Sequence, residues 1–219
     1  MISEKPRVSL LGTTALLFEA PGETTLKTQC RIWALARQVA RLPGVQEAVP
    51  GMNNLMIAFA EPPRELEAME RGLLELWTAV EPLPSEGRCL DLPVTYGGEG
   101  GPHMADVVAH TKMSVDDIVA IHSAPVYTVY ALGSHPGYCY LGGMDLRIAT
   151  PRRKVPVLKI PRGAVSIGGD QTGVSASDGP SGWNTIGSTQ VVFFDVARTP
   201  PALLAPGDRV RFKVERVVR

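Results

Sequence analysis

The first part of the chain alternates between a helical and a strand-like spacing of apolar residues. In residues 25–42 the apolar positions recur every three or four residues, which places them on one face of a helix that Pro43 and Gly44 end. A similar stripe over residues 62–80, with a proline at its start, predicts a second helix. Short apolar runs predict strands over residues 7–11, 14–20, 45–49 and 54–60. The order of these elements predicts a small α+β unit.

The segment EPLPSEG, residues 81–87, combines prolines, polar residues and a glycine, as linkers between domains commonly do. We therefore expect two domains, residues 1–84 and residues 85–219.

The second domain begins with a predicted strand over residues 88–96 and predicted helices over residues 103–111 and 114–124. Ser114 with Asp117 three residues later has the spacing of a capping box at the start of the second helix. Further strands, punctuated by Gly and Pro, are predicted over residues 126–132, 154–160, 163–169, 189–196 and 207–218. Regular short strands of this kind predict a barrel or a sandwich.

Charge and composition narrow the choice of function. The 219 residues hold 22 Lys and Arg against 22 Asp and Glu, a formal net charge of +0, which argues against a nucleic-acid-binding surface. No apolar run is long enough to predict a membrane-spanning helix. Three cysteines, Cys30, Cys89 and Cys139, are widely spaced and odd in number, so we expect free thiols and a cytoplasmic protein.

The stretch GSHPGYCYLGG, residues 133–143, stands out between predicted strands. Its glycines allow positive φ angles and close approach of the backbone, and its tyrosines suit a pocket wall or an interface. Both a tight corner of a barrel and a binding loop agree with this composition.

The common catalytic signatures are missing. The Gly-rich segment at residues 97–102 lacks the Lys-Ser/Thr of a nucleotide-binding phosphate loop, and Ser166 lacks the spacing of a nucleophile elbow. No Cys-x-x-Cys or His-x-x-x-His pair is present, so we expect no tightly bound metal. The four histidines are isolated, and Cys139 has no neighbouring base.

The order of short motifs is more informative than any one of them. LPVTYGG, IHS, LGSHPGYCYLGGMD, ATPRR, IGGDQTG, GWNTIGST and PGDRVRF follow one another along residues 92–212. Together they resemble the family of the 5-oxoprolinase B subunit, also called allophanate hydrolase subunit 1, which includes the sensor-kinase inhibitor KipI. The N-terminal half matches more loosely, through GTTALLFEA and PGVQEAVPGMNNLMIAF.

The resemblance implies an α+β fold in which a small N-terminal α+β domain precedes a cyclophilin-like β-barrel. It implies a component that acts with two further chains, one like the 5-oxoprolinase C subunit or KipA and one like the A subunit, to cleave 5-oxo-L-proline with ATP hydrolysis. It leaves a homo-oligomer open. Two alternatives remain: a binding module that inhibits a sensor histidine kinase, and a carboxyltransferase component of urea or allophanate metabolism beside a biotin enzyme.

The chemistry of lactam cleavage requires cations and N–H donors for phosphate or a developing oxyanion. We expect arginine side chains and backbone N–H groups of GGDQTG and SGWNTIGST to supply them. The predicted catalytic residues are Arg152, His122 and Gln171. The predicted substrate- and phosphate-binding residues are Tyr127, Gly137, Tyr140, Arg153, Thr172, Gly173, Trp183 and Thr189.

The chain departs from the family pattern at several positions. Ser134 stands where Phe is usual, Cys139 where Pro is usual, and Val157 where an arginine is usual. Residues 174–176 read VSA in place of IYP, and Ser181 replaces a glycine. These changes leave the substrate open between 5-oxoproline and another cyclic amide.

Overall fold

The computed structural model describes residues 4–84 and 87–219, and within them the chain forms two compact units on either side of residues 85–86. The boundary predicted between residues 84 and 85 adjoins these two residues, which lie outside the described part of the chain. Each unit has its own apolar core.

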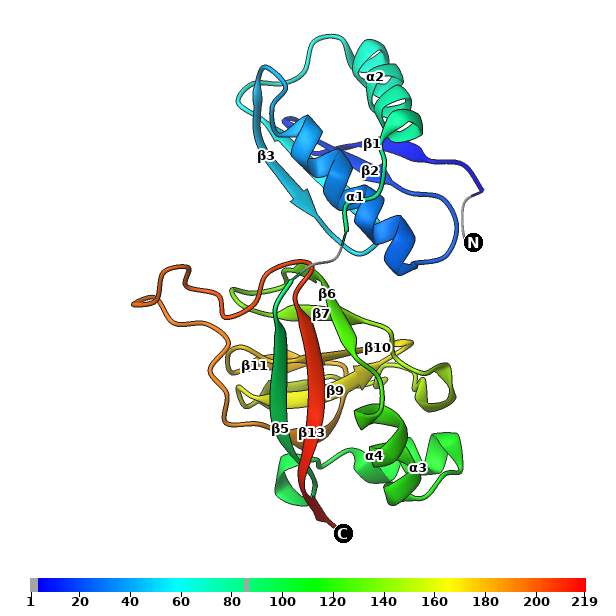
Figure 1. Cartoon of the computed structure of the whole chain (residues 1–219), viewed down its shortest axis with the longest axis vertical. Helices are drawn as coiled ribbons and strands as arrows, with labels where there is room; N and C mark the ends of the chain where they lie inside the picture. The colour runs from blue at the N-terminus through cyan, green and yellow to red at the C-terminus, as the bar shows by residue number, and fades with distance from the viewer. Residues whose placement is uncertain (1–3, 85–86) are drawn as a thin grey trace. The chain divides into compact units, whose positions relative to one another are not determined.

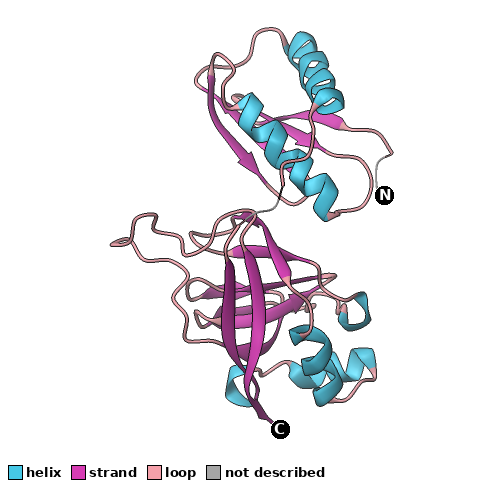
Figure 2. Cartoon of the chain, in the orientation of Figure 1, coloured by secondary structure: helices cyan, strands magenta, loops and turns pink. Residues whose placement is uncertain are grey.

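The N-terminal unit is a four-stranded antiparallel sheet with two helices on one face (Figure 1, Figure 2). The strands run in the order β1-β2-β4-β3, so the hairpin β1-β2 lies beside the hairpin β3-β4. Its elements are β1 Arg7–Leu11, β2 Ala15–Glu19, α1 Leu26–Val39, β3 Val45–Pro50, β4 Asn54–Phe59 and α2 Leu66–Ala79. The predicted order of strands and helices is confirmed.

The alternation of apolar residues explains this two-layer arrangement. Every second residue of β2 and β4 is buried, which gives the sheet one apolar face. Both helices cover that face: α1 begins at the N-cap Thr25, and the Trp77 ring of α2 lies 5.1 Å from the ring of Phe18 on β2.

The C-terminal unit is a closed barrel of seven strands, in the ring order β10-β7-β6-β13-β5-β12-β9. The α+β fold predicted from the sequence is thereby confirmed. The barrel strands are β5 Cys89–Gly97, β6 Tyr127–Leu132, β7 Cys139–Gly142, β9 Ala164–Gly168, β10 Gln171–Val174, β12 Asn184–Ser188 and β13 Arg209–Val218. The other elements are η1 Gly98–Gly100, α3 Met104–Thr111, α4 Val115–Ser123, η2 Leu146–Ile148, β8 Val157–Ile160 and β11 Gly179–Ser181.

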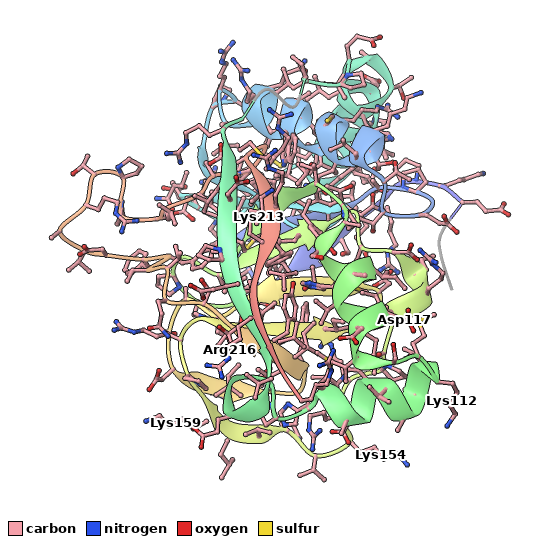
Figure 3. All side chains as sticks on the ribbon, turned by 60° about the horizontal axis from the view of Figure 1, so that its bottom comes forward. Lys112, Asp117, Lys154, Lys159, Lys213 and Arg216 are labelled. Carbon is pink, nitrogen blue, oxygen red and sulfur yellow. The ribbon has the colours of Figure 1, made fainter. Side chains whose placement is uncertain are left out.

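The first and last strands of the barrel close it. β13 pairs in parallel with β5 along its whole length, from Arg209 opposite Cys89 to Val218 opposite Gly97. Val210 and Phe212 of β13 point into the core, whereas Lys213 and Arg216 are exposed and point outward (Figure 3). From Arg209 to Phe212 this alternation places one face of the strand in the interior.

Two short helices complete the barrel core. α4 begins with the predicted capping box, in which the Asp117 amide donates to Ser114 Oγ at 3.1 Å and the Ser114 amide donates to the Asp117 carboxylate at 3.3 Å. The apolar side chains Met104 and Val107 of α3 and Ile118 of α4 join the core cluster.

Several sequence expectations need correction here. The predicted strand over residues 189–196 is wrong: this apolar segment is irregular and carries one isolated bridge, from Phe194 to Ala202. β8 is a strand as predicted, but it pairs with β11 in a separate two-stranded sheet. β7 occupies the second half of the stretch at residues 133–143, where no strand was predicted, and β10, β11 and β12 were not predicted either. No helix in the described residues is both long and apolar enough to cross a membrane.

Candidate functional site

A polar cavity of about 220 Å³ opens on the C-terminal unit beside the β6–β7 connection. Three segments line it: the connection and the start of β7, the segment that carries Arg152, and residues 175–183 around β11. We call it the rim pocket. It brings together three of the predicted site residues, Tyr140, Arg152 and Trp183, and adds His135 and Tyr138.

Two consecutive turns shape the β6–β7 connection. The amide of His135 donates to the carbonyl of Gly133 at 2.7 Å, and Ser134 between them has φ +64°, which makes a strained γ-turn. The amide of Tyr138 then donates to the carbonyl of His135 at 3.1 Å, with Pro136 and Gly137 in the middle and Gly137 at φ +79°. Proline followed by a positive-φ glycine is the sequence signature of a type II turn.

Residues 133–143 therefore form both a tight hairpin corner and one wall of a pocket. Gly137 is the predicted site residue that serves the corner: a Cβ there would lie 2.7 Å from the Cβ of Phe194. Cys139 is buried in the same corner, and burial raises the pKa of its thiol to about 12, which leaves it unreactive.

An aromatic cluster forms the wall of the rim pocket. The Tyr138 ring lies 5.0 Å from the Tyr140 ring, 5.1 Å from the His135 ring and 6.2 Å from the Trp183 ring, with the Tyr140 and Trp183 contacts edge-to-face. Burial raises the pKa of Tyr138, so its phenol stays protonated. Such a wall suits a flat ligand.

Glycines beneath two of these rings make room for them. A Cβ at Gly168 would lie 2.4 Å from the Trp183 ring, and a Cβ at Gly173 would lie 2.6 Å from the Tyr138 hydroxyl oxygen. The two glycines belong to adjacent strands, β9 and β10. The Gly-rich motif IGGDQTG therefore serves to seat the aromatic wall.

Arg152 supplies the charge of the rim pocket. Its guanidinium carbon lies 5.6 Å from the centroid of the Trp183 ring, and no ion pair of the described residues includes it. Its backbone neighbours are fixed: Asn184 Nδ2 donates to the Pro151 carbonyl at 2.9 Å, and the Arg153 amide donates to the Gly182 carbonyl at 2.7 Å. The site thus holds an exposed cation on a fixed stretch of backbone, available to an anionic group.

His135 carries the one side-chain polar atom, among the described residues of the rim pocket, that is buried without a partner. Its Nε2 is enclosed and makes no hydrogen bond, in contrast to most buried polar atoms of folded proteins. Burial lowers the pKa of His135, which keeps its imidazole neutral near pH 7.

The predicted catalytic residue His122 lies inside the barrel instead, and this expectation is corrected. Its side chain is fully buried, with Nδ1 2.8 Å from the Tyr96 hydroxyl and Nε2 2.9 Å from the Thr172 hydroxyl. Thr172 donates its proton to the Ser166 carbonyl, so His122 Nε2 carries a proton and Nδ1 accepts from Tyr96. Burial lowers the pKa of His122 to about 3, which leaves this imidazole neutral.

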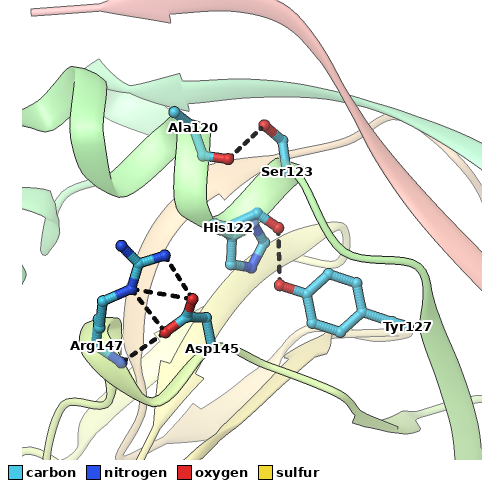
Figure 4. A network of polar contacts seen from close by, with 6 residues as sticks. All are labelled: Ala120, His122, Ser123, Tyr127, Asp145 and Arg147. Atoms are coloured by element: carbon cyan, nitrogen blue, oxygen red, sulfur yellow. Dashed lines mark hydrogen bonds and ion pairs between the residues drawn. The ribbon is translucent and has the colours of Figure 1, made fainter.

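Tyr127 and Thr172, both predicted to bind substrate, belong to the same buried network. The Tyr127 hydroxyl donates to the His122 carbonyl at 2.7 Å, as Figure 4 shows beside the exposed ion pair of Asp145 and Arg147. Since β5 and β10 stand on opposite sides of the seven-strand ring, His122 braces the barrel from inside.

The remaining predicted site residues lie outside the lining of the rim pocket. Arg153 pairs with Asp106 of α3, and Thr189 is buried with its hydroxyl accepting from the Val191 amide at 3.3 Å. Gln171 and Gly173 lie on β10, whose position between β7 and β9 commits its backbone to the sheet. Pairing with both neighbours occupies backbone groups from Gln171 to Gly173, and the anion-binding role expected of the GGDQTG backbone stays a prediction.

Sequence reasoning missed His135 as a site residue, because a lone histidine is most often structural. The signal was its place immediately before Pro136 and Gly137, which fix the turn that encloses it. The described residues contain no group of three His, Cys, Asp or Glu side chains that could hold a metal ion.

Comparisons with known proteins agree with this architecture. Residues 6–204 match the family model described as carboxyltransferase domain, subdomain C and D. The B subunit of 5-oxoprolinase from Escherichia coli O157:H7 is 45% identical over 210 residues, which cover 95% of this chain and 96% of that protein.

Two solved structures share the fold. The crystal structure of TTHA0988 superimposes with a TM-score of 0.75 at 30% identity, covering 94% of this chain and 40% of that one. The Kluyveromyces lactis urea amidolyase superimposes with a TM-score of 0.79 at 19% identity, covering 99% of this chain and 15% of that one. The chain therefore spans less than half of each of these two longer proteins.

Proposed function

The chain belongs to the family of the 5-oxoprolinase B subunit, and on that premise we propose that it is one component of an ATP-dependent 5-oxoprolinase complex. The complex cleaves 5-oxo-L-proline, or a related cyclic amide, to the open-chain acid. The observation that supports this proposal best is the rim pocket, in which the Arg152 guanidinium stands beside the aromatic wall of Tyr138, Tyr140 and Trp183.

The pocket suits the chemistry of a lactam. A lactam carbon is a poor electrophile, and negative charge gathers on the amide oxygen as the carbon is attacked or the oxygen is phosphorylated. In our proposal Arg152 stabilises this charge, and the rings hold the flat face of the amide. The backbone on either side of Arg152 is fixed by hydrogen bonds, which anchors the base of this side chain at the pocket.

ATP itself does not fit the rim pocket. The cavity of about 220 Å³ is smaller than the roughly 300–1,000 Å³ of pockets that enclose drug-sized ligands, and Arg152 is the one Lys or Arg among the described residues that line it. We therefore assign ATP to another part of the complex, whose partners are a chain like the A subunit and a chain like the C subunit or KipA. Free thiols at Cys30, Cys89 and Cys139 support a cytoplasmic location for the complex.

The test is steady-state, ATP-dependent cleavage of 5-oxo-L-proline by the reconstituted complex. We expect Arg152→Ala to lower turnover about a hundred- to a thousandfold, the usual cost of losing a preorganised donor to an oxyanion. Arg152→Lys should recover only part, because an ammonium cannot reproduce the planar fork of a guanidinium.

Arg147→Ala is the matched control, since Arg147 is exposed on the same unit and pairs with Asp145. A loss below about threefold for Arg152→Ala, in a complex that still assembles, would move the charge-stabilising role to another residue or chain.

Carboxyl transfer is a second candidate, favoured by the description of the matching family model. Both reactions pass through an anionic oxygen, so Arg152 would serve either one. Transfer of a carboxyl group from carboxybiotin to urea, in the absence of lactam cleavage, would favour this candidate.

A further inference from the structure

Strands β8 and β11 form a two-stranded ribbon that is separate from the barrel sheet and borders the rim pocket. In the described strand pairing each of the two has the other as its partner and no third strand beside it. Pro180 and Ser181 of β11 line the rim pocket, and so does Arg152, which precedes β8. We call residues 152–162 together with residues 175–182 the pocket ribbon.

Two apolar side chains of the pocket ribbon are exposed to solvent almost completely. Leu158 is 89% exposed and Val155 is 77% exposed. Among the other large apolar residues that the structure describes, only Val196 reaches a comparable value, 85%. Single exposed apolar residues are ordinary, but two of them three positions apart beside a pocket favour a contact surface.

The pocket ribbon is also strongly basic, in a chain whose formal net charge is +0. Residues 152–162 contain no Asp or Glu, and Asp178 is the one acidic residue of residues 175–182. Figure 3 shows Lys154 and Lys159 projecting outward from the molecule. This surface is complementary to a protein face that carries carboxylates. The cations of the pocket ribbon are Arg152, Arg153, Lys154, Lys159 and Arg162.

The backbone of the pocket ribbon is poorly suited to pairing with a further strand. Pro156 and Pro161 flank β8, and Pro180 lies within β11. Each proline lacks an amide donor, and prolines and lysines on edge strands are a common protection against pairing with another chain. The pocket ribbon therefore offers a partner its side chains rather than an open strand edge.

Contact with the pocket ribbon would also change the electrostatics of the rim pocket. Arg152 is exposed, so water weakens its attraction for an anionic oxygen. A protein that docks at Pro180 and Ser181 stands against the lining of the pocket and displaces water from it. Displacing water strengthens the interaction of a cation with a developing negative charge.

We propose that the pocket ribbon is the docking surface for a partner protein of the complex. The contacting face of that partner offers an apolar depression to Leu158 and Val155, bordered by carboxylates that lie opposite the cations of the pocket ribbon. The docked partner covers the rim pocket and shields Arg152 from water. This inference rests on the proposed function for the existence of the partner, and on exposure and charge for the location of the surface.

The experiment measures binding of the full chain to each of its two partner proteins by titration calorimetry and stopped flow. We expect Leu158→Ser to weaken binding about tenfold or more, the effect expected from losing the burial of one leucine side chain. Lys154→Glu should slow association, and more so at low salt than at high salt. Because both side chains are exposed, the thermal midpoint of each variant should stay within about 2 °C of wild type.

Two matched controls lie away from the rim pocket. Val196 is as exposed as Leu158 and follows β12 in an irregular segment, and Lys213 is exposed on β13. Neither residue lines the rim pocket, so Val196→Ser and Lys213→Glu should bind the partners as wild type does. Raising the partner concentration should restore turnover to Leu158→Ser but not to Arg152→Ala, since mass action compensates only a weakened contact.

Equal binding by wild type, Leu158→Ser and Lys154→Glu would overturn the inference. So would a wild-type chain that binds neither partner protein, or one that uses Leu158 to bind vesicles of anionic lipid instead. The proposed function can fail separately. A complex that assembles through Leu158 but does not cleave 5-oxo-L-proline keeps the docking surface and refutes the reaction. A complex that cleaves it and binds Leu158→Ser as tightly as wild type keeps the reaction and refutes the docking surface.

Discussion

Two histidines of the C-terminal unit both pack against tyrosine rings but differ in the hydrogen bonds of their ring nitrogens. His122 inside the barrel has hydroxyl partners on both ring nitrogens, Tyr96 on one side and Thr172 on the other. His135 at the rim pocket packs against Tyr138 and leaves Nε2 enclosed without a partner. Both are neutral because burial lowers their pKa values. A fully bonded polar group stabilises a fold, whereas an enclosed polar atom without a partner costs free energy.

The largest expected effect concerns the stability of the barrel. His122→Ala leaves the hydroxyls of Tyr96 and Thr172 unpartnered and opens a cavity, so we expect the free energy of unfolding to fall by about 3–5 kcal/mol. His135→Ala should change it by less than about 1 kcal/mol, because its Nε2 has no bond to lose. Urea denaturation followed by circular dichroism measures both. Equal losses for the two variants would contradict the distinction between the histidines.

We expect the free energy of unfolding to fall with pH, because the buried His122 imidazole is neutral in the folded protein. The pKa of His122 is about 3 in the folded protein, well below the value of about 6.5 expected for an unfolded chain. The unfolded state therefore binds a proton first as pH falls below about 6.5, and stability is lost between that pH and the folded pKa. From pH 7 to pH 5 this one group should remove about 2 kcal/mol from the free energy of unfolding.

The measurement compares urea midpoints at both pH values for wild type, His122→Gln and the exposed control His110→Gln. His103 and His135 also have lowered pKa values and add to the fall in every protein that keeps them. The informative quantity is therefore the difference between variants. If wild type and His122→Gln lose the same free energy between pH 7 and pH 5, the buried histidine is not the cause.

The smallest expected effect tests how the aromatic wall is seated. Gly173→Ala places a Cβ 2.6 Å from the Tyr138 hydroxyl oxygen and 3.1 Å from the Cys139 carbonyl, so the ring must shift. We expect a stability loss of about 1–2 kcal/mol together with weaker ligand binding at the rim pocket. Gly179→Ala is the control, since no atom lies within 4 Å of its added Cβ and its φ is not positive. Unchanged binding by Gly173→Ala would show that Tyr138 can move without harm.

The N-terminal unit followed from the sequence because each of its elements buries one side only. β2 and β4 alternate between buried and partly exposed residues, and this alternation is visible as a pattern. In the barrel β12 is buried at nearly every position, so the alternation that identifies a strand disappears, and this strand was not predicted. Gly173 gave β10 the composition of a loop, although this glycine accommodates the Tyr138 ring.

The candidate site was predictable only in part, because motif positions do not show whether a side chain faces a pocket or the core. Arg152, Tyr140 and Trp183 came from motif positions and do meet in one pocket. His122 came from the same motifs and lies in the core. Whether a histidine has partners on both nitrogens depends on strands distant in sequence, such as β5 and β10, and no local pattern records it.

The parallel pairing of β5 with β13 also sets how this unit can form during synthesis. The two strands are joined by contacts such as the one from Arg211 to Asp91, 120 residues apart in sequence. Contacts of such long range are slow to form, because a long loop must close before any of them stabilises the chain. Until residues 209–218 leave the ribosome, β5 and β6 lack the strand between them and expose open edges to other chains. The barrel therefore closes late, and a nascent chain of this protein benefits from protection of those edges until its last strand arrives.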